Sequence, residues 1–166
     1  MADKAIGNTS VTIMPDRIKT RFAGACNYEP ADATEKWYYT ETAISVSGAD
    51  NILPVENFVA TTDDIHDADK IKWIAIKHSG FTTSAKTIET TDNIMLSHTG
   101  ATPVYNGTTT TTGALIGPNE VFVCKFNGTT VADLHAAIVA MTGTNASAAG
   151  SSTVFAYIAA VIDDVA

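Results

Sequence analysis

The stretch IKWIAIKHSG, residues 71–80, decides the fold of this chain. Its large apolar residues recur with a period of two, which is typical of a β-strand. Two apolar faces should result, with Ile71, Trp73 and Ala75 on one face and Ile74 and Ile76 on the other. Because both faces are apolar, we expect this strand to lie inside a sandwich or next to a subunit contact.

Similar patterns occur on both sides of this strand. The sequence predicts further extended segments at 10–15, 17–22, 37–48, 51–62, 86–90, 93–97 and 152–164, the last with a short helix as the alternative. Residues 24–36 and 63–70 are rich in turn-forming residues and are predicted to be loops. About nine or ten short strands joined by closely spaced turns are typical of a β-sandwich, with the jelly roll as one candidate topology.

The stretch GALIGPNEVFVCKFNGTT, residues 113–130, has the character of a hairpin. Its Gly-Pro-Asn sequence at 117–119 predicts a tight turn between two strands. In the second strand, we expect the alternating residues to face inward, namely Phe122, Cys124 and Phe126. The five threonines that precede this stretch should form a solvent-facing lead-in.

One short helix is predicted after this unit. Thr130 and Asp133 have the spacing of a capping box, and Gly143 is suited to end a helix. Four apolar residues in between fall on one helical face: Val131, Leu134, Ile138 and Met141.

Composition supports a β-rich domain. The chain of 166 residues is 45% hydrophobic and 17% charged, and it contains 25 threonines, which are β-branched and suit strands with one face in water. We therefore expect an all-β chain: a β-sandwich with one short helix. Residues 1–9 should form an N-terminal arm, and residues 10–166 a single β-sandwich domain.

Charge and sequence signals bear on partners. The net charge of -8 disfavours direct binding to nucleic acid, because the phosphate backbone would be repelled. The longest apolar run, residues 154–162, is too short to cross a bilayer, and no signal peptide is recognised, so we expect no membrane association. Cys124 should be a buried apolar residue, although a disulfide to Cys26 is an alternative.

Three groups of residues are candidate binding sites. Residues 63–70 gather four aspartates and His66, which would suit Ca²⁺, yet the EF-hand spacing is absent and a solvated acidic turn is the simpler interpretation. Residues 37–39, Trp-Tyr-Tyr, would suit a sugar platform. Arg17, Lys19 and Arg21 share one strand face and form either a solvated stripe or a contact for an acidic neighbour.

No catalytic motif accompanies these clusters. The four histidines are scattered, and nucleophile-elbow, phosphate-loop and zinc motifs are absent. We expect no enzyme activity, no cofactor, and no catalytic, cofactor-binding or metal-binding residues.

Residues 71–80, IKWIAIKHSG, and 115–130, LIGPNEVFVCKFNGTT, resemble β-sandwich structural proteins of tailed bacteriophages. The resemblance covers roughly the second half of the chain and rests on a buried strand ending in an IK-x-x-G turn and a later strand after a Gly-Pro-x-Glu turn. It implies a virion structural protein: most simply a capsid decoration or cement protein that stabilises the assembled shell. Its partners would be the major capsid protein or other virion subunits, and it would be a homo-oligomer, with a trimer favoured.

Two alternatives stay open. The chain is a neck or tail component of the virion, or it is a carbohydrate- or receptor-binding module that uses Trp37, Tyr38 and Tyr39 or the threonine-rich loop.

Overall fold

The computed structural model describes residues 4–13, 20–45, 50–98, 113–142, 145–149 and 153–165. These residues form eleven strands and one turn of 3-10 helix. The strands are β1 (Asn8–Ile13), β2 (Thr20–Ala25), β3 (Glu35–Ile44), β4 (Asp50–Asn51), β5 (Lys70–His78), β6 (Asn93–His98), β7 (Ala114–Ile116), β8 (Val121–Thr130), β9 (Leu134–Thr142), β10 (Asn145–Ala149) and β11 (Val154–Asp163), and the 3-10 turn is η1 (Val131–Asp133).

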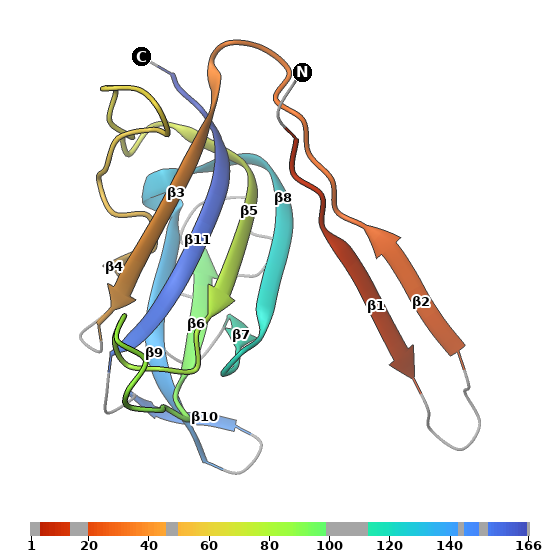
Figure 1. The fold of residues 1–166 in the computed structure, drawn as a ribbon, viewed down its shortest axis with the longest axis vertical. Coiled ribbons are helices and arrows are strands. Elements are labelled where there is room, and N and C mark those ends of the chain that lie inside the picture. Colours follow the sequence, from red (N-terminus) through yellow and green to blue (C-terminus); the bar gives the residue numbers. More distant parts are fainter. Residues whose placement is uncertain are drawn as a thin grey trace.

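Two antiparallel sheets pack against each other to form the body (Figure 1). One sheet has the strand order β3-β11-β5-β8. The other has the order β10-β9-β6-β7, with β4 also paired to β9. The predicted all-β sandwich is therefore confirmed.

The pairing is that of a jelly roll. If β10 is set aside, the eight body strands pair as first with last, second with seventh, third with sixth and fourth with fifth, which is the pattern of one long hairpin: β3 with β11, β4 with β9, β5 with β8, and β6 with β7. Two further pairs, β11 with β5 and β9 with β6, close the rolled hairpin into two sheets. The jelly roll, which the sequence suggests as one candidate topology, is therefore the observed topology.

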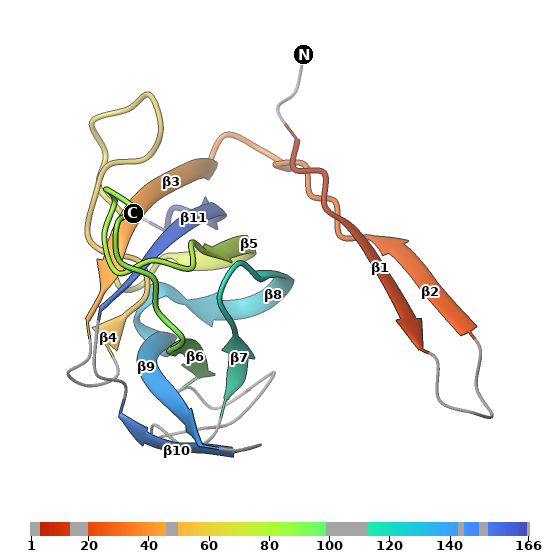
Figure 2. The ribbon, with the colours of Figure 1, turned by 60° about the horizontal axis from the view of Figure 1, so that its bottom comes forward.

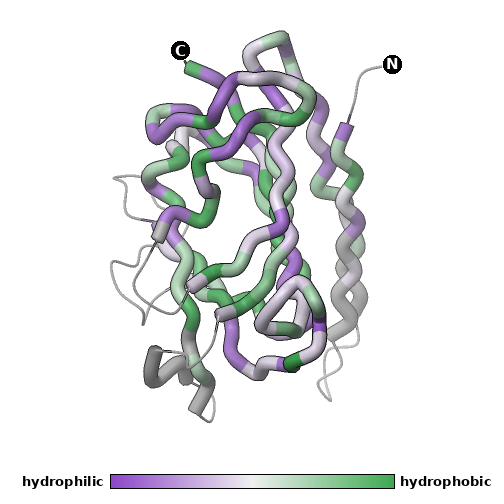
Figure 3. The backbone as a smooth tube through the Cα atoms, turned by 60° about the vertical axis from the view of Figure 1, so that its left-hand side comes forward, coloured by the Kyte–Doolittle hydropathy of each residue, from purple (hydrophilic) through white to green (hydrophobic). Residues whose placement is uncertain are grey.

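The core between the sheets is almost entirely aliphatic. Large side chains without solvent exposure include Ile74 and Ile76 of β5, Ile94 and Leu96 of β6, and Ile158 of β11. Phe122, Cys124 and Phe126 of β8 also pack on this core, as their alternation predicts. Hydrophobic and hydrophilic segments are mixed along the backbone of the body (Figure 3), and two strands are apolar on both faces, since every residue of β6 and most of β11 are buried.

A bulge in β5 changes the predicted face of one residue. Trp73 and Ala75 lie on the outer face as expected, but Ile71 is buried in the inner core with Ile74 and Ile76. The register against β11 shifts between Ile71 and Trp73, so that Lys72 is an extra residue on β5. Such an extra residue breaks the period of two, which explains why the prediction for Ile71 was wrong.

The predicted helix at 130–143 is wrong. Thr130 does bond to Asp133, whose Oδ2 accepts from the Thr130 hydroxyl at 2.8 Å, but this contact closes only η1. Residues Leu134–Thr142 are strand β9, with Leu134 and Ile138 buried. A spacing of four positions satisfies a helical face and a strand face equally, and pairing of β9 with β6 decides between them. The alternative helix at 152–164 is also not formed, because β11 occupies this region.

The predicted turn at 117–119 is present, but the hairpin is not. Asn119 has φ 65°, the left-handed conformation that asparagine tolerates. The strands on either side do not pair with each other, since β7 pairs with β6 in one sheet and β8 pairs with β5 in the other. The turn therefore passes the chain from one layer of the sandwich to the other.

Two more expectations concern segments between strands. Residues 86–90, predicted as a strand, form a loop with an isolated bridge between Phe81 and Glu89, and Lys86 has a positive φ of 53°. The threonine run lies outside the described residues. In the part of the chain that the structure describes, no helix is long and apolar enough to span a membrane.

Strands β1 and β2 form a separate two-stranded ribbon. Hydrogen bonds extend the ribbon to its base, where Cys26 N donates to Gly7 O and Ala5 N donates to Tyr28 O, each at 2.7 Å. The base packs on the body, while β1 and β2 lie apart from it in both views (Figures 1 and 2). The predicted boundary between an arm at 1–9 and a domain at 10–166 falls inside β1.

Candidate functional site

The outer face of the β3-β11-β5-β8 sheet is unusually apolar. Its register sets side chains in three rows that cross the four strands: Trp37, Val161, Trp73 and Lys125; then Tyr39, Ala159, Ala75 and Val123; then Glu41, Tyr157, Lys77 and Val121. An antiparallel sheet with one face on the core usually turns a polar face to solvent. This second apolar face therefore marks a surface that other parts of the chain, or other molecules, cover.

The ribbon base covers the first row. Ala5 packs against Trp73 and Val161, and Trp73 Nε1 donates a hydrogen bond to Cys26 O at 3.0 Å. Tyr28 adds a second attachment, because its hydroxyl donates to the carboxylate of Glu35 at 2.9 Å. Burial and this carboxylate raise the pKa of Tyr28 to about 12, so the hydroxyl keeps its proton at any physiological pH.

A loop borders the other end of the face. The segment 79–90 leaves the end of β5 and stays beside β11, with Ser79 N donating to Phe155 O at 3.0 Å and Phe155 N donating to Phe81 O at 2.9 Å. It then turns back so that Lys86 Nζ lies 5.2 Å from the ring centroid of Tyr157. Between the ribbon base and this loop lie the small residues Ala75 and Ala159, which are partly buried against the cluster at the ribbon base.

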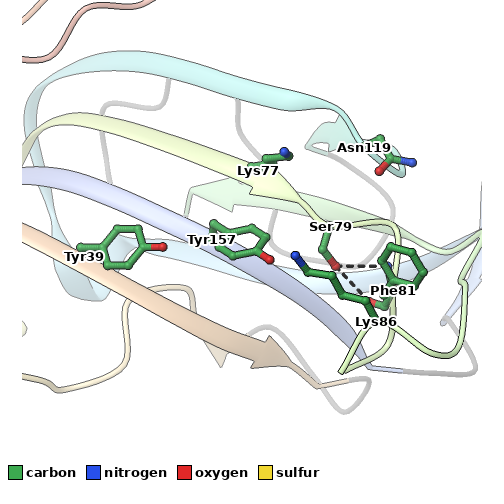
Figure 4. Close-up of a pocket in the computed structure, with 7 residues that line it drawn as sticks. All are labelled: Tyr39, Lys77, Ser79, Phe81, Lys86, Asn119 and Tyr157. Carbon is green, nitrogen blue, oxygen red and sulfur yellow. Dashed lines mark hydrogen bonds between the residues drawn. The ribbon is translucent and has the colours of Figure 1, made fainter. Parts of the chain in front are cut away.

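A pocket of about 520 Å³ opens beside the 79–90 loop (Figure 4). Seven residues from three strands, the 79–90 loop and the 117–119 turn line it: Tyr39, Lys77, Ser79, Phe81, Lys86, Asn119 and Tyr157. Figure 4 shows the rings of Tyr39 and Tyr157 side by side on the sheet and the ammonium of Lys86 close to the Tyr157 hydroxyl. The pocket thus combines flat aromatic surface with two cationic groups.

Among the described residues, the two lysines of this pocket form no ion pair with a carboxylate. Ion pairs within 4.0 Å in this part of the chain involve Lys36 and Lys72, and none involves Lys77 or Lys86. A hydrogen bond with Tyr157 and the charge of Glu41 raise the pKa of Lys86, so it stays protonated. Glu41 itself accepts a hydrogen bond from the Tyr39 hydroxyl at 2.8 Å, and this bond raises the pKa of Tyr39.

A second pocket, of about 440 Å³, lies beside Trp37. Two of its three charged lining residues are already engaged, since Lys36 pairs with Asp63 and Asp164 and Glu35 accepts from Tyr28, and the third is Lys4. Trp37 Nε1 is buried without a hydrogen-bond partner among the described residues. Because this atom is not accessible, the second pocket offers a ligand fewer groups than the first.

The residues proposed as a sugar platform do not lie together. Trp37 and Tyr39 are on the outer face, whereas Tyr38 is fully buried in the core and its hydroxyl donates to Pro54 O at 3.0 Å. Alternation along β3 separates them. Of the three, Tyr39 is the one that lines the larger pocket.

The acidic turn at 63–70 is held by internal contacts. Asp69 is buried, and its carboxylate accepts from the backbone N–H groups of His66 at 2.8 Å and Val165 at 3.0 Å. Asp63 pairs with Lys36 at 2.8 Å. Within the described ranges, no group of three or more His, Cys, Asp or Glu side chains is arranged to hold a metal ion. Through Asp69, the turn is held against the residues that follow β11.

The histidines and cysteines are also separate. His78 and His98 are buried in different strands, His135 bonds to Ala132 O, and His66 is exposed. Cys26 and Cys124 are both free thiols, so the alternative of a disulfide between them is not formed. Of the basic stripe, Arg17 and Lys19 lie outside the described residues, as does the side chain of Arg21.

Three pocket residues were not singled out from the sequence: Lys77, Lys86 and Tyr157. A signal existed for Lys77, because it follows Trp73 and Ala75 on the outer face of an otherwise apolar strand. Tyr157 is likewise the one hydroxyl-bearing residue in the apolar run 154–162. Lys86 carried no such signal, since the turn-back of its loop depends on tertiary contacts. Comparisons with protein-family models, with curated proteins and with solved structures found no match to this chain.

Proposed function

We propose that this protein is a virion structural protein, most simply a capsid decoration protein that binds and stabilises the assembled shell as a homo-oligomer. The observation that carries the proposal is the β1–β2 ribbon, which leaves the jelly-roll body (Figure 2). A two-stranded ribbon is marginally stable by itself in water, and both of its edges present unpaired backbone groups. Such an arm gains stability when it lies against a neighbouring subunit.

The two strands of the ribbon pair in register over their whole length, from Asn8 with Ala25 to Ile13 with Thr20. Ordering the ribbon costs conformational entropy, which burial against a neighbouring subunit offsets.

The fold supports the same class by analogy. Jelly rolls occur in viral capsid and lectin domains, although a fold does not by itself imply a function. Many copies on one shell would bind through weak individual contacts that multivalency strengthens. A position in the neck or tail of the virion would use the same ribbon and body.

The first test is binding to shells. The purified chain should co-sediment with assembled shells of the capsid protein encoded beside its gene, and not with free capsid subunits. By light scattering it should be a small oligomer, with a trimer favoured. A chain that stays monomeric and does not co-sediment would contradict the proposal.

Shortening the ribbon tests whether it is the arm that mediates assembly. Because Gly7 and Cys26 are hydrogen-bonded partners, residues 8–25 can be replaced by Asn-Gly, which suits a two-residue turn. This variant should keep the circular-dichroism spectrum of the body but lose oligomerisation and shell binding. Ile88→Ser, which changes a 60% exposed residue on the body, is the matched control and should retain both. Full oligomerisation of the shortened variant would show that the ribbon is not the assembly arm.

A further inference from the structure

We infer that the pocket lined by Tyr39, Tyr157, Lys77 and Lys86 binds an acidic saccharide, that is, a sugar that carries a carboxylate. This inference concerns a different surface from the ribbon and does not depend on the proposed structural role. The pocket lies on the outer sheet face beside the 79–90 loop. Two properties of the pocket point to this ligand: its charge and its aromatic surface.

The charge of the pocket is opposite to that of the chain. The protein has a net charge of -8, yet two lysines converge here from β5 and from the 79–90 loop without a carboxylate within 4.0 Å among the described residues. Glu120, at the neighbouring turn, bonds to Gly117 N at 2.7 Å. Glu41 is held by the Tyr39 hydroxyl. A ligand carboxylate would therefore meet two ammonium groups, one of which, that of Lys86, also contacts the Tyr157 ring.

The aromatic surface suits the apolar faces of a sugar ring. Tyr39 is 50% exposed, and it lies in the row next to Tyr157 on the same sheet face. Ligand pockets typically combine aromatic walls with a few polar groups that fix orientation. Here the phenol groups, the Asn119 amide and the lysine ammonium groups can all bond to hydroxyls.

The aromatic surface favours a saccharide over a simple anion. Lysines bind carboxylate and phosphate alike through their point charges, whereas the exposed rings of Tyr39 and Tyr157 suit the apolar face of a sugar. Nucleic acid is disfavoured by repulsion from the acidic body.

The experiment is a titration of the full chain with two trisaccharides. Trigalacturonate should bind, as measured by calorimetry and by amide chemical-shift changes confined to the pocket, and neutral cellotriose should bind at least tenfold more weakly. Raising the salt concentration from 50 to 500 mM should weaken trigalacturonate binding, because screening reduces the contribution of the lysines. Equal binding of the two sugars would overturn the acidic preference, and failure of both to bind would overturn the site.

Variants separate the pocket from general surface charge. Lys86→Gln and Tyr39→Ala should each reduce trigalacturonate affinity about tenfold or more. Lys125→Gln is the matched control, since Lys125 Nζ lies 5.8 Å from the ring centroid of Tyr28, a similar cation–π contact outside the pocket. A loss of affinity in Lys125→Gln as large as that in Lys86→Gln would overturn the site. Lys86→Gln and Tyr39→Ala change residues of the pocket and not of the ribbon or its base, so loss of shell binding and loss of sugar binding can be told apart.

Discussion

His78 shows how a single residue couples a loop to the core. It is fully buried at the end of β5, where Gly80 N donates to its Nδ1 at 2.9 Å and its Nε2 lies 2.9 Å from Asp92 O. Since Nδ1 accepts a hydrogen bond, Nε2 must carry the proton and donate a hydrogen bond to Asp92 O, which defines one neutral tautomer of His78. Burial lowers the pKa of His78, against the opposing effects of the Asp92 carbonyl and the charges of Glu120 and Asp92.

The first prediction follows from this lowered pKa. The unfolded chain binds a proton at His78 near pH 6.5, whereas the folded chain does so only at lower pH. The contribution of neutral, buried His78 to the free energy of unfolding is therefore complete above about pH 6.5, and it is lost as the pH falls below that value. Urea unfolding should show lower stability at pH 5 than at pH 7.5.

His78→Asn tests the assignment. The asparagine oxygen can still accept from Gly80 N, but the bond to Asp92 O is lost, so we expect about 1–3 kcal/mol lower stability at pH 7.5. The decrease in stability between pH 7.5 and 5 should become smaller than in the unchanged protein. His66→Asn, at an exposed site, should leave that decrease as it is. An identical pH dependence in His78→Asn and the unchanged chain would rule out His78 as its source.

At the scale of the strand, the bulge at Lys72 decides which side chains enter the core. Lys72 is the extra residue of β5 relative to β11, so that Ile71 and Ile74 both face inward although they are three positions apart. On the outside, Lys72 Nζ pairs with Asp163 at 3.1 Å. The side chain therefore contributes a partly exposed ion pair, while the backbone of the same residue sets the register.

The second prediction separates these two contributions. Lys72→Ala removes the ion pair and should cost at most about 1 kcal/mol. Ile71→Ala removes a side chain that the bulge allows to face the core, and it should cost about 2–5 kcal/mol, the range for loss of a large buried side chain. Urea unfolding with unchanged m-value measures both. Equal costs for the two variants would mean that Ile71 does not pack in the core.

At the scale of the whole molecule, the rolled hairpin joins segments that are far apart in the sequence. Thr34, just before β3, bonds through its hydroxyl to Asp163 at the end of β11, a separation of 129 residues. The β11 strand is then inserted between β3 and β5. Closing such long loops before the contacts form is entropically costly, and folds dominated by distant pairings fold slowly.

The last prediction concerns this slow closure. Refolding from urea, followed by tryptophan fluorescence, should take milliseconds to seconds. Trp37 and Trp73 report on this closure because their rings come into edge-to-face contact only when β3, β11 and β5 have assembled. Their ring centroids are then 6.4 Å apart. The variant with the shortened ribbon should refold at a similar rate, since β1 and β2 pair locally. Refolding in microseconds would contradict the proposed order of events.

The sequence by itself determined the all-β class, the inward residues of β8 and the tight turn at Asn119, because each depends on a local period or on backbone chemistry that neighbouring residues dictate. Only the tertiary structure decided the state of residues 134–142, the face of Ile71 and the separation of β7 from β8. In each case the local pattern is compatible with two structures, and hydrogen bonds to a distant strand select one. The candidate saccharide pocket depends on the same distant pairings, since β3, β5 and β11 bring Tyr39, Lys77 and Tyr157 together from positions that no sequence spacing relates.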